Sequence, residues 1–218
     1  MEEFDDVKEV LMRVGALPRF TTNEMSYYLS WSTNGLINEY CNEADAIYEG
    51  KPIKVMPLEG AEKLVIEGES FEAFNTSGGC ATMCETYADK VENLTYKTIR
   101  YPGHLNHMKF LFNDLHLKKN KDILEKLFDK EVPRTKNDLI IFFVKVIGLI
   151  DGVLQEKTYL RKIYGDEKFS AIQLTTASGA CSALKMFLDG KISSKGFIKQ
   201  ESLSWKDFID NKFGSVYQ

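Results

Sequence analysis

A long hairpin in the second half of the chain constrains the fold more than any other feature. Residues 137–165, NDLIIFFVKVIGLIDGVLQEKTYLRKIYG, hold two long runs rich in strand-forming residues on either side of Asp151-Gly152. Asp-Gly is a pair favoured in type I′ turns, whose twist matches that of antiparallel strands. The first run is apolar almost throughout, which predicts a central strand, whereas the second alternates, which predicts one solvated face. The chain is therefore expected to build a sheet around this hairpin.

Shorter elements are predicted before and after the hairpin. A strand over 7–14 is expected to end at Gly15 and Pro18, and Asn23 is expected to cap a short helical piece. Further strands are predicted in a meander over 46–74 and in 94–101. Further helices are predicted after a cap at Ser32 or Thr33 and over 81–90, 104–115, 121–128, 170–188 and 205–211. This order predicts an α+β fold: one domain, residues 1–218, with a mixed, largely antiparallel sheet and helices packed on one face.

Composition excludes several classes of protein. The chain has 218 residues and a net charge of -4, without a basic stripe, which argues against nucleic acid as a partner. Its acidic start, MEEFDDVKEV, lacks the apolar region of a signal peptide, and its longest apolar stretch, 139–150, is too short to span a bilayer. The four cysteines lack zinc-site spacing and are typical of reduced thiols. We therefore expect a cytoplasmic protein that binds neither nucleic acid nor a membrane.

The segment KTIRYPGH at 97–104 is the one most suited to chemistry. Arg100 is permanently charged, and its planar fork suits a carboxylate. At the end of a core strand it must meet an acid, a carbonyl or a ligand, because an unpaired buried charge is costly. The candidate acids within the chain are Glu59, Glu72 and Glu85. These residues alone leave open whether Arg100 forms a structural ion pair or a substrate clamp.

Other candidate groups are less specific. His104 and His107 share a helix face, but no third ligand accompanies them, so no metal site is predicted. Residues 75–79, NTSGG, precede a predicted helix and can form either an anion site or a capped loop. Trp31 and the tyrosines before it form either core or a pocket wall. Dinucleotide, P-loop, HExxH and GxSxG motifs are missing from the sequence, which disfavours a hydrolase.

Six segments together carry a family resemblance over nearly the whole chain. They are GALP at 15–18, SWSTNGLINEY at 30–40, EAFNTSGG at 72–79, KTIRYPGH at 97–104, AIQLTTASG at 171–179 and KGFIKQE at 195–201. These segments resemble saccharopine dehydrogenase-like oxidoreductases, and most of all bacterial members grouped with saccharopine reductase and lysine 6-dehydrogenase. The resemblance is to the C-terminal domain of such enzymes alone, because the nucleotide fingerprint of their Rossmann domain does not occur here.

The resemblance implies a function in amino-acid metabolism. It implies the substrate-binding and dimerisation domain of an oxidoreductase that acts on the CH-NH group of saccharopine or a lysine-like amino acid. NAD or NADP would bind the Rossmann domain of the same parent protein, not this chain, so the isolated chain is expected to be inactive. The expected partners are the amino acid, that Rossmann domain and a second copy in a homodimer. The alternative is a non-catalytic self-association module without a substrate pocket, which would use the small-residue helix 170–188.

The resemblance also implies roles for individual residues. Arg100 would bind an amino-acid carboxylate, with Tyr101 beside it in the cleft. His104 would form hydrogen bonds there and is the candidate general base for the amine proton. The remaining residues that it implies around the substrate are Gly15, Leu17, Trp31, Thr76 and Ser77.

Overall fold

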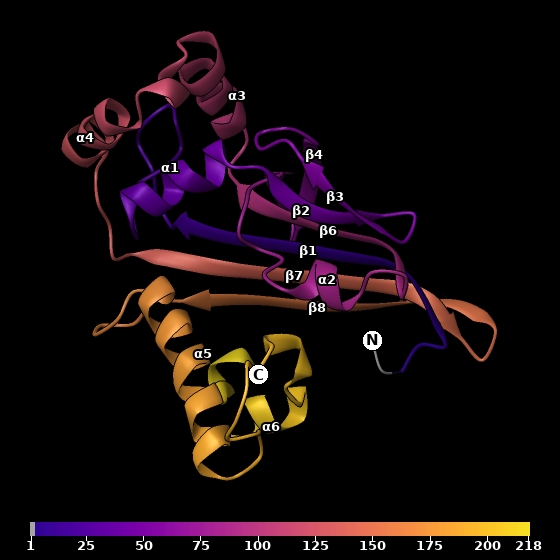
Figure 1. Cartoon of the computed structure of the whole chain (residues 1–218). Helices are drawn as coiled ribbons and strands as arrows, with labels where there is room; N and C mark the ends of the chain where they lie inside the picture. The colour runs from indigo at the N-terminus through magenta and orange to yellow at the C-terminus, as the bar shows by residue number, and fades with distance from the viewer. Residues whose placement is uncertain (1–2) are drawn as a thin grey trace.

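A twisted sheet runs through the whole protein in the structure, a computed structural model that describes residues 3–218 (Figure 1). Within those residues the sheet has eight strands, six of them in the order β3-β2-β6-β1-β7-β8, while β5 pairs with β6 and β4 with β5. The strands are β1 (Asp6–Pro18), β2 (Ala44–Tyr48), β3 (Lys51–Val55), β4 (Glu62–Ile66), β5 (Glu69–Phe74), β6 (Val91–Arg100), β7 (Asp138–Ile150) and β8 (Val153–Tyr164). Only β1 and β6 pair in parallel; the other pairs are antiparallel. The predicted α+β fold is confirmed.

Helices connect the strands and gather mainly on one side of the sheet. They are α1 (Thr33–Cys41), α2 (Met83–Thr86), α3 (His104–Lys109), α4 (Lys121–Glu131), α5 (Ala171–Leu188) and α6 (Trp205–Ile209). Figure 1 shows α1, α3 and α4 grouped at one end, with α5 and α6 beside β7 and β8. Among the described residues, no helix combines the length and the apolarity needed to cross a bilayer.

The predicted hairpin is confirmed, with one correction. Asp151 and Gly152 have φ angles of 52° and 73°, the left-handed values that a type I′ turn needs. As predicted, β7 is an inner strand, between β1 and β8. The prediction of a single solvated face for β8 is wrong for its first half, because residues 153–158 are all exposed. The hairpin tip projects past the helices, so neither face of that half-strand is covered (Figure 1).

Strand β1 is longer than predicted, because Gly15 does not end it. Gly15 pairs with Ile141 of β7, and the strand continues to Pro18. An ideal Cβ on Gly15 would lie 2.9 Å from Cβ of Ile99, so glycine allows the neighbouring strand to approach closely. The predicted turn at this glycine is therefore wrong: the residue serves packing between strands.

Two further predictions of local structure are wrong. The helix expected over 81–90 is a single turn, α2, because Ala81 and Asp89 adopt left-handed φ angles of 46° and 59° on either side of it. Asn23 caps no helix: its side chain bonds both the backbone N–H and the carbonyl of Tyr27 and closes a loop. By contrast, the cap at Ser32 is confirmed, and so is the helix predicted over 170–188, which the structure shows capped at Ser170.

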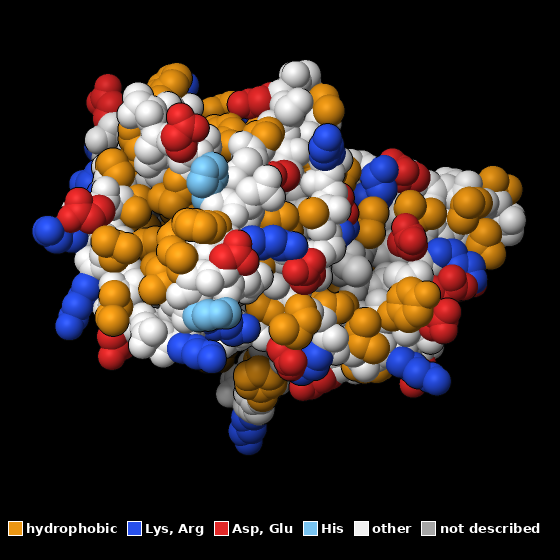
Figure 2. Space-filling model, turned by 90° about the horizontal axis from the view of Figure 1, so that it is seen from above, with side chains coloured by type: hydrophobic (Ala, Val, Ile, Leu, Met, Phe, Trp, Pro, Cys, Tyr) orange, Lys and Arg blue, Asp and Glu red, His pale blue; other side chains and the backbone are white. Residues whose placement is uncertain are grey.

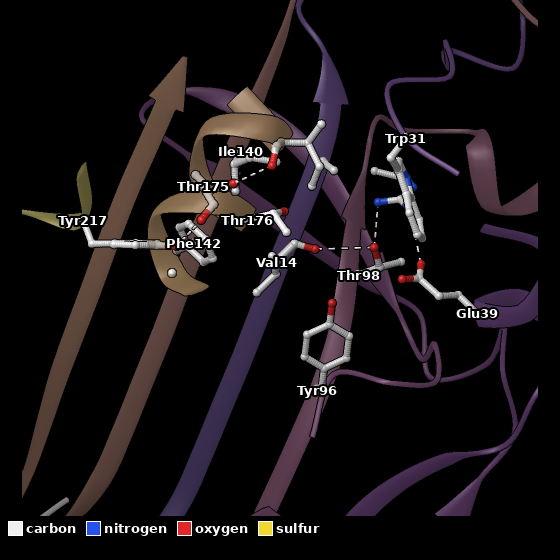
Figure 3. Close-up of a pocket in the computed structure, with 14 residues that line it drawn as sticks. Val14, Trp31, Glu39, Tyr96, Thr98, Ile140, Phe142, Thr175, Thr176 and Tyr217 are labelled. Atoms are coloured by element: carbon white, nitrogen blue, oxygen red, sulfur yellow. Dashed lines mark hydrogen bonds and ion pairs between the residues drawn. The ribbon is translucent and has the colours of Figure 1, made fainter. Parts of the chain in front are cut away.

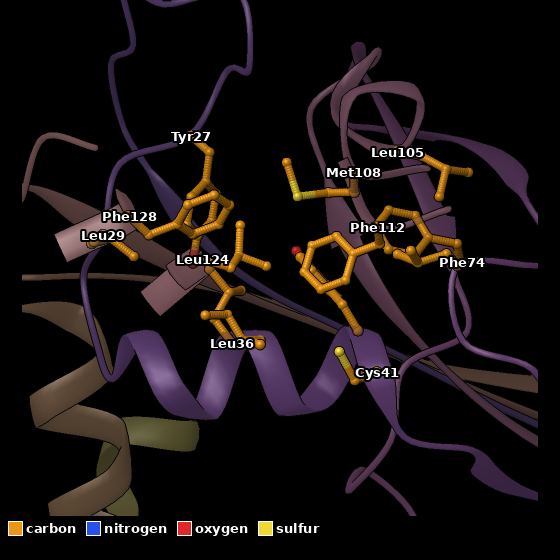
Figure 4. Packing of buried hydrophobic residues seen from close by; sticks show 13 residues of the cluster. Tyr27, Leu29, Leu36, Cys41, Phe74, Leu105, Met108, Phe112, Leu124 and Phe128 are labelled. Atoms are coloured by element: carbon orange, nitrogen blue, oxygen red, sulfur yellow. The ribbon is translucent and has the colours of Figure 1, made fainter. Parts of the chain in front are cut away.

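The largest apolar cluster fills the space between α1, α3, α4 and the π-helical turn Phe110–Asp114 (Figure 4). Leu36 of α1, Met108 of α3 and Leu124 of α4 are fully buried there. A separate cluster around Leu17 and Ile99 lies under the β4–β5 hairpin on the opposite face of the sheet. The two clusters fix α1 and the end of β6 relative to each other. Outside, Lys, Arg, Asp and Glu side chains are interspersed over the face seen in Figure 2, without a field of one sign.

Candidate functional site

A cavity of about 300 Å³ lies over the sheet, between α1 and the first half of α5 (Figure 3). Val14 of β1 and Thr98 of β6 belong to its floor. Trp31, just before α1, and Glu39 within α1 form one wall, and Thr176 of α5 belongs to the other. Four segments that are distant in sequence therefore meet at this cavity, which is large enough for part of a small ligand.

Arg100 lies at the inner end of this cavity, and its side chain is only 2% exposed. Its Nε donates to the hydroxyl of Tyr40 at 2.9 Å, and its Nη1 donates to Thr98 Oγ1 at 2.6 Å and to the carbonyl of Ile99 at 2.8 Å. Its Nη2 lies 3.9 Å from Glu39 Oε2, too far for a hydrogen bond. One side of the guanidinium is therefore fixed by the protein, and Nη2 remains available.

None of the glutamates proposed from sequence pairs with Arg100. Glu72 instead accepts from backbone N–H groups at the start of α3, and Glu59 and Glu85 pair with lysines. Glu39, which the sequence analysis did not select, is the acid closest to the guanidinium. Glu39 lies between Ile37 and Tyr40, two residues of the buried stripe of α1, but it is not part of that stripe itself. Helical geometry therefore turns it from the core toward the cavity.

Glu39 has an unusual electrostatic environment. Its side chain is 28% exposed, and Arg100 is the other charged residue in the cavity lining. Burial raises the pKa of Glu39 to about 7, although the positive charge of Arg100 acts in the opposite direction. A carboxyl group with this pKa can exchange a proton near neutral pH.

Behind Arg100, a chain of hydrogen bonds passes from Tyr40 to His104. His104 Nδ1 lies 2.9 Å from the carbonyl of Met25, so it carries the proton and donates. The other nitrogen, Nε2, therefore accepts from the Tyr40 hydroxyl at 3.0 Å. Burial and the charge of Arg100 lower the pKa of His104 to about 3. This neutral, fully buried imidazole holds Tyr40 in place to accept from Arg100.

An aromatic wall covers the same guanidinium. The Tyr27 ring lies with its centroid 5.3 Å from the central carbon of Arg100, and its hydroxyl accepts from Trp31 Nε1 at 3.2 Å. The Trp31 ring rests on Gly35, where an ideal Cβ would lie 2.5 Å from a ring carbon. The glycine in SWSTNG therefore allows the indole to lie flat against α1 and line the cavity.

The other residues predicted for the site lie elsewhere. Gly15 and Leu17 alternate with the cavity-facing residues of β1, so they face the opposite side of the sheet. Tyr101 also lies there, where its ring stacks on Phe71. Thr76 is buried, and its hydroxyl has no hydrogen-bond partner within residues 3–218.

Ser77 supports the site from behind α1. Its backbone N–H donates to the carbonyl of Glu39 at 3.2 Å, and its hydroxyl donates to the carbonyl of Asn38 at 3.4 Å. Neither Thr76 nor Ser77 is part of the cavity lining described above. Across residues 3–218, no group of three or more His, Cys, Asp or Glu side chains is arranged to hold a metal ion.

Fold and cavity together define an α+β domain in which a buried arginine lines a cavity over the sheet. The family model described as saccharopine dehydrogenase C-terminal domain matches residues 1–212, so the chain belongs to this family. Its fold is similar to that of a solved structure, apo histidine-tagged saccharopine dehydrogenase (L-Glu forming) from Saccharomyces cerevisiae, with a TM-score of 0.70 and 17% identity. The similarity covers 88% of this chain and 61% of that one, so this chain spans less than two thirds of that relative. The predicted family is thereby confirmed.

Proposed function

We propose that this chain is the substrate-binding and dimerisation domain of an NAD(P)-dependent oxidoreductase that acts on the CH-NH group of an amino acid, of the saccharopine or lysine kind. The observation that carries this proposal is the preorganised guanidinium of Arg100 at the end of a cavity. Membership of the family and the similarity of fold support it.

In this proposal, Arg100 binds the carboxylate of the amino acid through Nη2. Because Nε and Nη1 are already fixed by Tyr40, Thr98 and a carbonyl, the group needs little reordering when the ligand binds. A charge-assisted hydrogen bond in this water-poor position is stronger than one at the surface. The indole of Trp31 covers the aliphatic part of the ligand.

Glu39 takes the amine side of the ligand in this proposal. Its carboxylate lies 3.9 Å from the guanidinium, so a ligand can place its carboxylate at Arg100 and its nitrogen at Glu39. With a pKa of about 7, Glu39 can accept the amine proton. His104, the base considered from sequence, positions Tyr40 instead, because both of its nitrogens are engaged and its ring is fully buried.

The glycine-rich turn at 75–79 lacks the features of a dinucleotide phosphate site. The glycines at 78–79 lead into α2, a helix of four residues, and Gly79 packs against the ring of Tyr96. A phosphate site needs a longer helix behind a glycine-rich turn. The proposal therefore assigns NAD or NADP to a Rossmann domain of the same parent protein. The four free cysteines, which suit a reducing compartment, extend the proposal to the cytoplasm.

One observation favours the alternative of a self-association module without a substrate pocket. Leu184, Phe187 and Leu188 near the end of α5 are 56%, 44% and 70% exposed, which is unusual for a cluster of large apolar side chains. The same surface supports the dimer in the main proposal. The two differ in whether the cavity at Arg100 binds a ligand.

The test is a binding titration with saccharopine and L-lysine, followed through the fluorescence of Trp31 in a Trp205→Phe background. Arg100→Lys keeps the positive charge but loses the fork, and we expect it to weaken binding about tenfold or more. Arg13→Lys is the matched control, because Arg13 is 3% exposed, binds Glu62 and lies on the opposite face of the sheet. Equal loss in both variants, or no loss in Arg100→Lys, would contradict the proposal.

A further inference from the structure

Tyr96 of β6 presents its hydroxyl group to the cavity. The residue belongs to the cavity lining, and Figure 3 shows its hydroxyl pointing toward Thr98. That hydroxyl forms no hydrogen bond with residues 3–218. The fully buried side-chain atoms without a partner among the same residues belong to Ser30 and Thr76, so the Tyr96 hydroxyl is not one of them and is accessible. It is therefore available to a ligand in the cavity.

Strand geometry places this hydroxyl in line with the groups that already form the site. Alternate side chains of a strand lie on the same face, so Tyr96, Thr98 and Arg100 of β6 all face the cavity. The hydroxyl of Thr98 is engaged, because it accepts from Arg100 Nη1 at 2.6 Å and donates to the carbonyl of Val14 at 3.4 Å. Of the two hydroxyls in this row, that of Tyr96 is the one left for a ligand.

The ring that carries the hydroxyl is held in place by Gly79. An ideal Cβ on Gly79 would lie 2.2 Å from Cγ and from Cδ1 of the Tyr96 ring, so glycine allows the loop to lie directly on the ring face. The ring also packs against the apolar cluster that contains Val10 and Leu94. The second glycine of NTSGG therefore serves the cavity, because it fixes the orientation of a phenol in its lining.

The surroundings of the Tyr96 hydroxyl favour a positively charged ligand group. The charged residues in the cavity lining are Arg100 and Glu39. Burial raises the pKa of Tyr96 and the charge of Glu39 raises it further, whereas Arg100 lowers it and acts less strongly. The phenol is therefore protonated and neutral near pH 7, and its nearer charge is the carboxylate. Its oxygen can accept a hydrogen bond from an ammonium group that Glu39 attracts.

We propose that Tyr96 is a further ligand-binding residue of this cavity, which shares with Glu39 the α-ammonium group of the amino acid whose carboxylate binds Arg100. The inference rests on the proposed function and adds to it a limit on the class of ligand. Two acceptors need two N–H groups on one nitrogen. The site therefore selects a primary or secondary α-amine, which carries at least two N–H groups when protonated, over a tertiary amine, which carries one.

The test compares L-lysine, Nα-methyl-L-lysine and Nα,Nα-dimethyl-L-lysine, whose protonated α-nitrogens carry successively fewer N–H groups. Binding is followed through Trp31 fluorescence in a Trp205→Phe background, with and without Tyr96→Phe. We expect Tyr96→Phe to weaken binding of lysine and of the monomethyl ligand about tenfold, because it removes a hydrogen bond to a charged group, and to change binding of the dimethyl ligand by less than about twofold. Tyr48→Phe, at a tyrosine of β2 that is 58% exposed, is the matched control and should change none of the affinities.

The outcomes separate this inference from the function on which it rests. If Tyr96→Phe weakens all three ligands alike, or weakens none, the role of Tyr96 is refuted, while a loss of affinity for all three in Arg100→Lys would leave the carboxylate clamp standing. If Tyr48→Phe acts like Tyr96→Phe, the role of Tyr96 is also refuted. If the chain with Tyr96 intact binds none of the three ligands, both proposals fail.

Discussion

Replacing Glu39 by Gln tests the electrostatics of the site without changing its shape. Burial holds the pKa of Glu39 at about 7 in the folded protein, against an ordinary value of 4.5. Between these values the folded protein keeps a proton that the unfolded chain has lost, so the stability of the wild type falls as pH rises. Since one pKa unit corresponds to about 1.4 kcal/mol, the free energy of unfolding that the wild type loses through Glu39 approaches roughly 3 kcal/mol above pH 7. The glutamine variant has no such cost at any pH.

We therefore expect Glu39→Gln to match the wild type near pH 4 and to be the more stable protein near pH 8. The assay is urea unfolding between these limits, with thermal unfolding as a check. For a chain of this size, 1 kcal/mol corresponds to roughly 2–4 °C in Tm. Glu43→Gln, at an exposed glutamate just after α1, controls for the loss of one negative charge. A stability difference that does not change with pH would refute the reasoning, because it would mean that Glu39 ionises as it does in the unfolded chain.

Two further substitutions test how the site is supported. Gly35→Ala places a Cβ against the Trp31 ring and should lower the free energy of unfolding by about 1–3 kcal/mol. In a Trp205→Phe background, we also expect a red shift of the indole emission. An unchanged spectrum would show that the indole does not rest on α1. Tyr40→Phe leaves Arg100 Nε and His104 Nε2 without their hydrogen-bond partner. We therefore expect the free energy of unfolding in urea to fall by roughly 1–3 kcal/mol and ligand binding to weaken. Unchanged values of both quantities would contradict the hydrogen-bond chain.

Local chemistry made part of the fold predictable. Asp151-Gly152 specifies its turn through two left-handed residues, and Ser170 caps α5 in a complete capping box with Gln173. Such features depend on residues that are close in sequence. The role of Gly15 depends on Ile99 of another strand, so its sequence context suggested a turn where the structure has a close approach between strands.

The candidate site was predictable in the same limited way. Arg100 and Trp31 stood out by residue type, and both line the cavity. Tyr101 could have been placed correctly, because side chains alternate along a strand and Arg100 and Tyr101 are adjacent. Glu39 gave a weaker signal, a single carboxylate beside a buried helical stripe. The wall that α5 contributes depends on how the helix packs on β7 and β8, which no local pattern encodes.

The measurement that tests the central claim most directly compares L-lysine with cadaverine, which lacks only the carboxylate. Binding of each would be followed through Trp31 fluorescence in a Trp205→Phe chain that is otherwise wild type, with saccharopine as a further ligand. The account predicts that cadaverine binds at least about tenfold more weakly than lysine, because Arg100 loses its anionic partner. Equal or tighter binding of cadaverine, or a chain that binds neither lysine nor saccharopine, would contradict it.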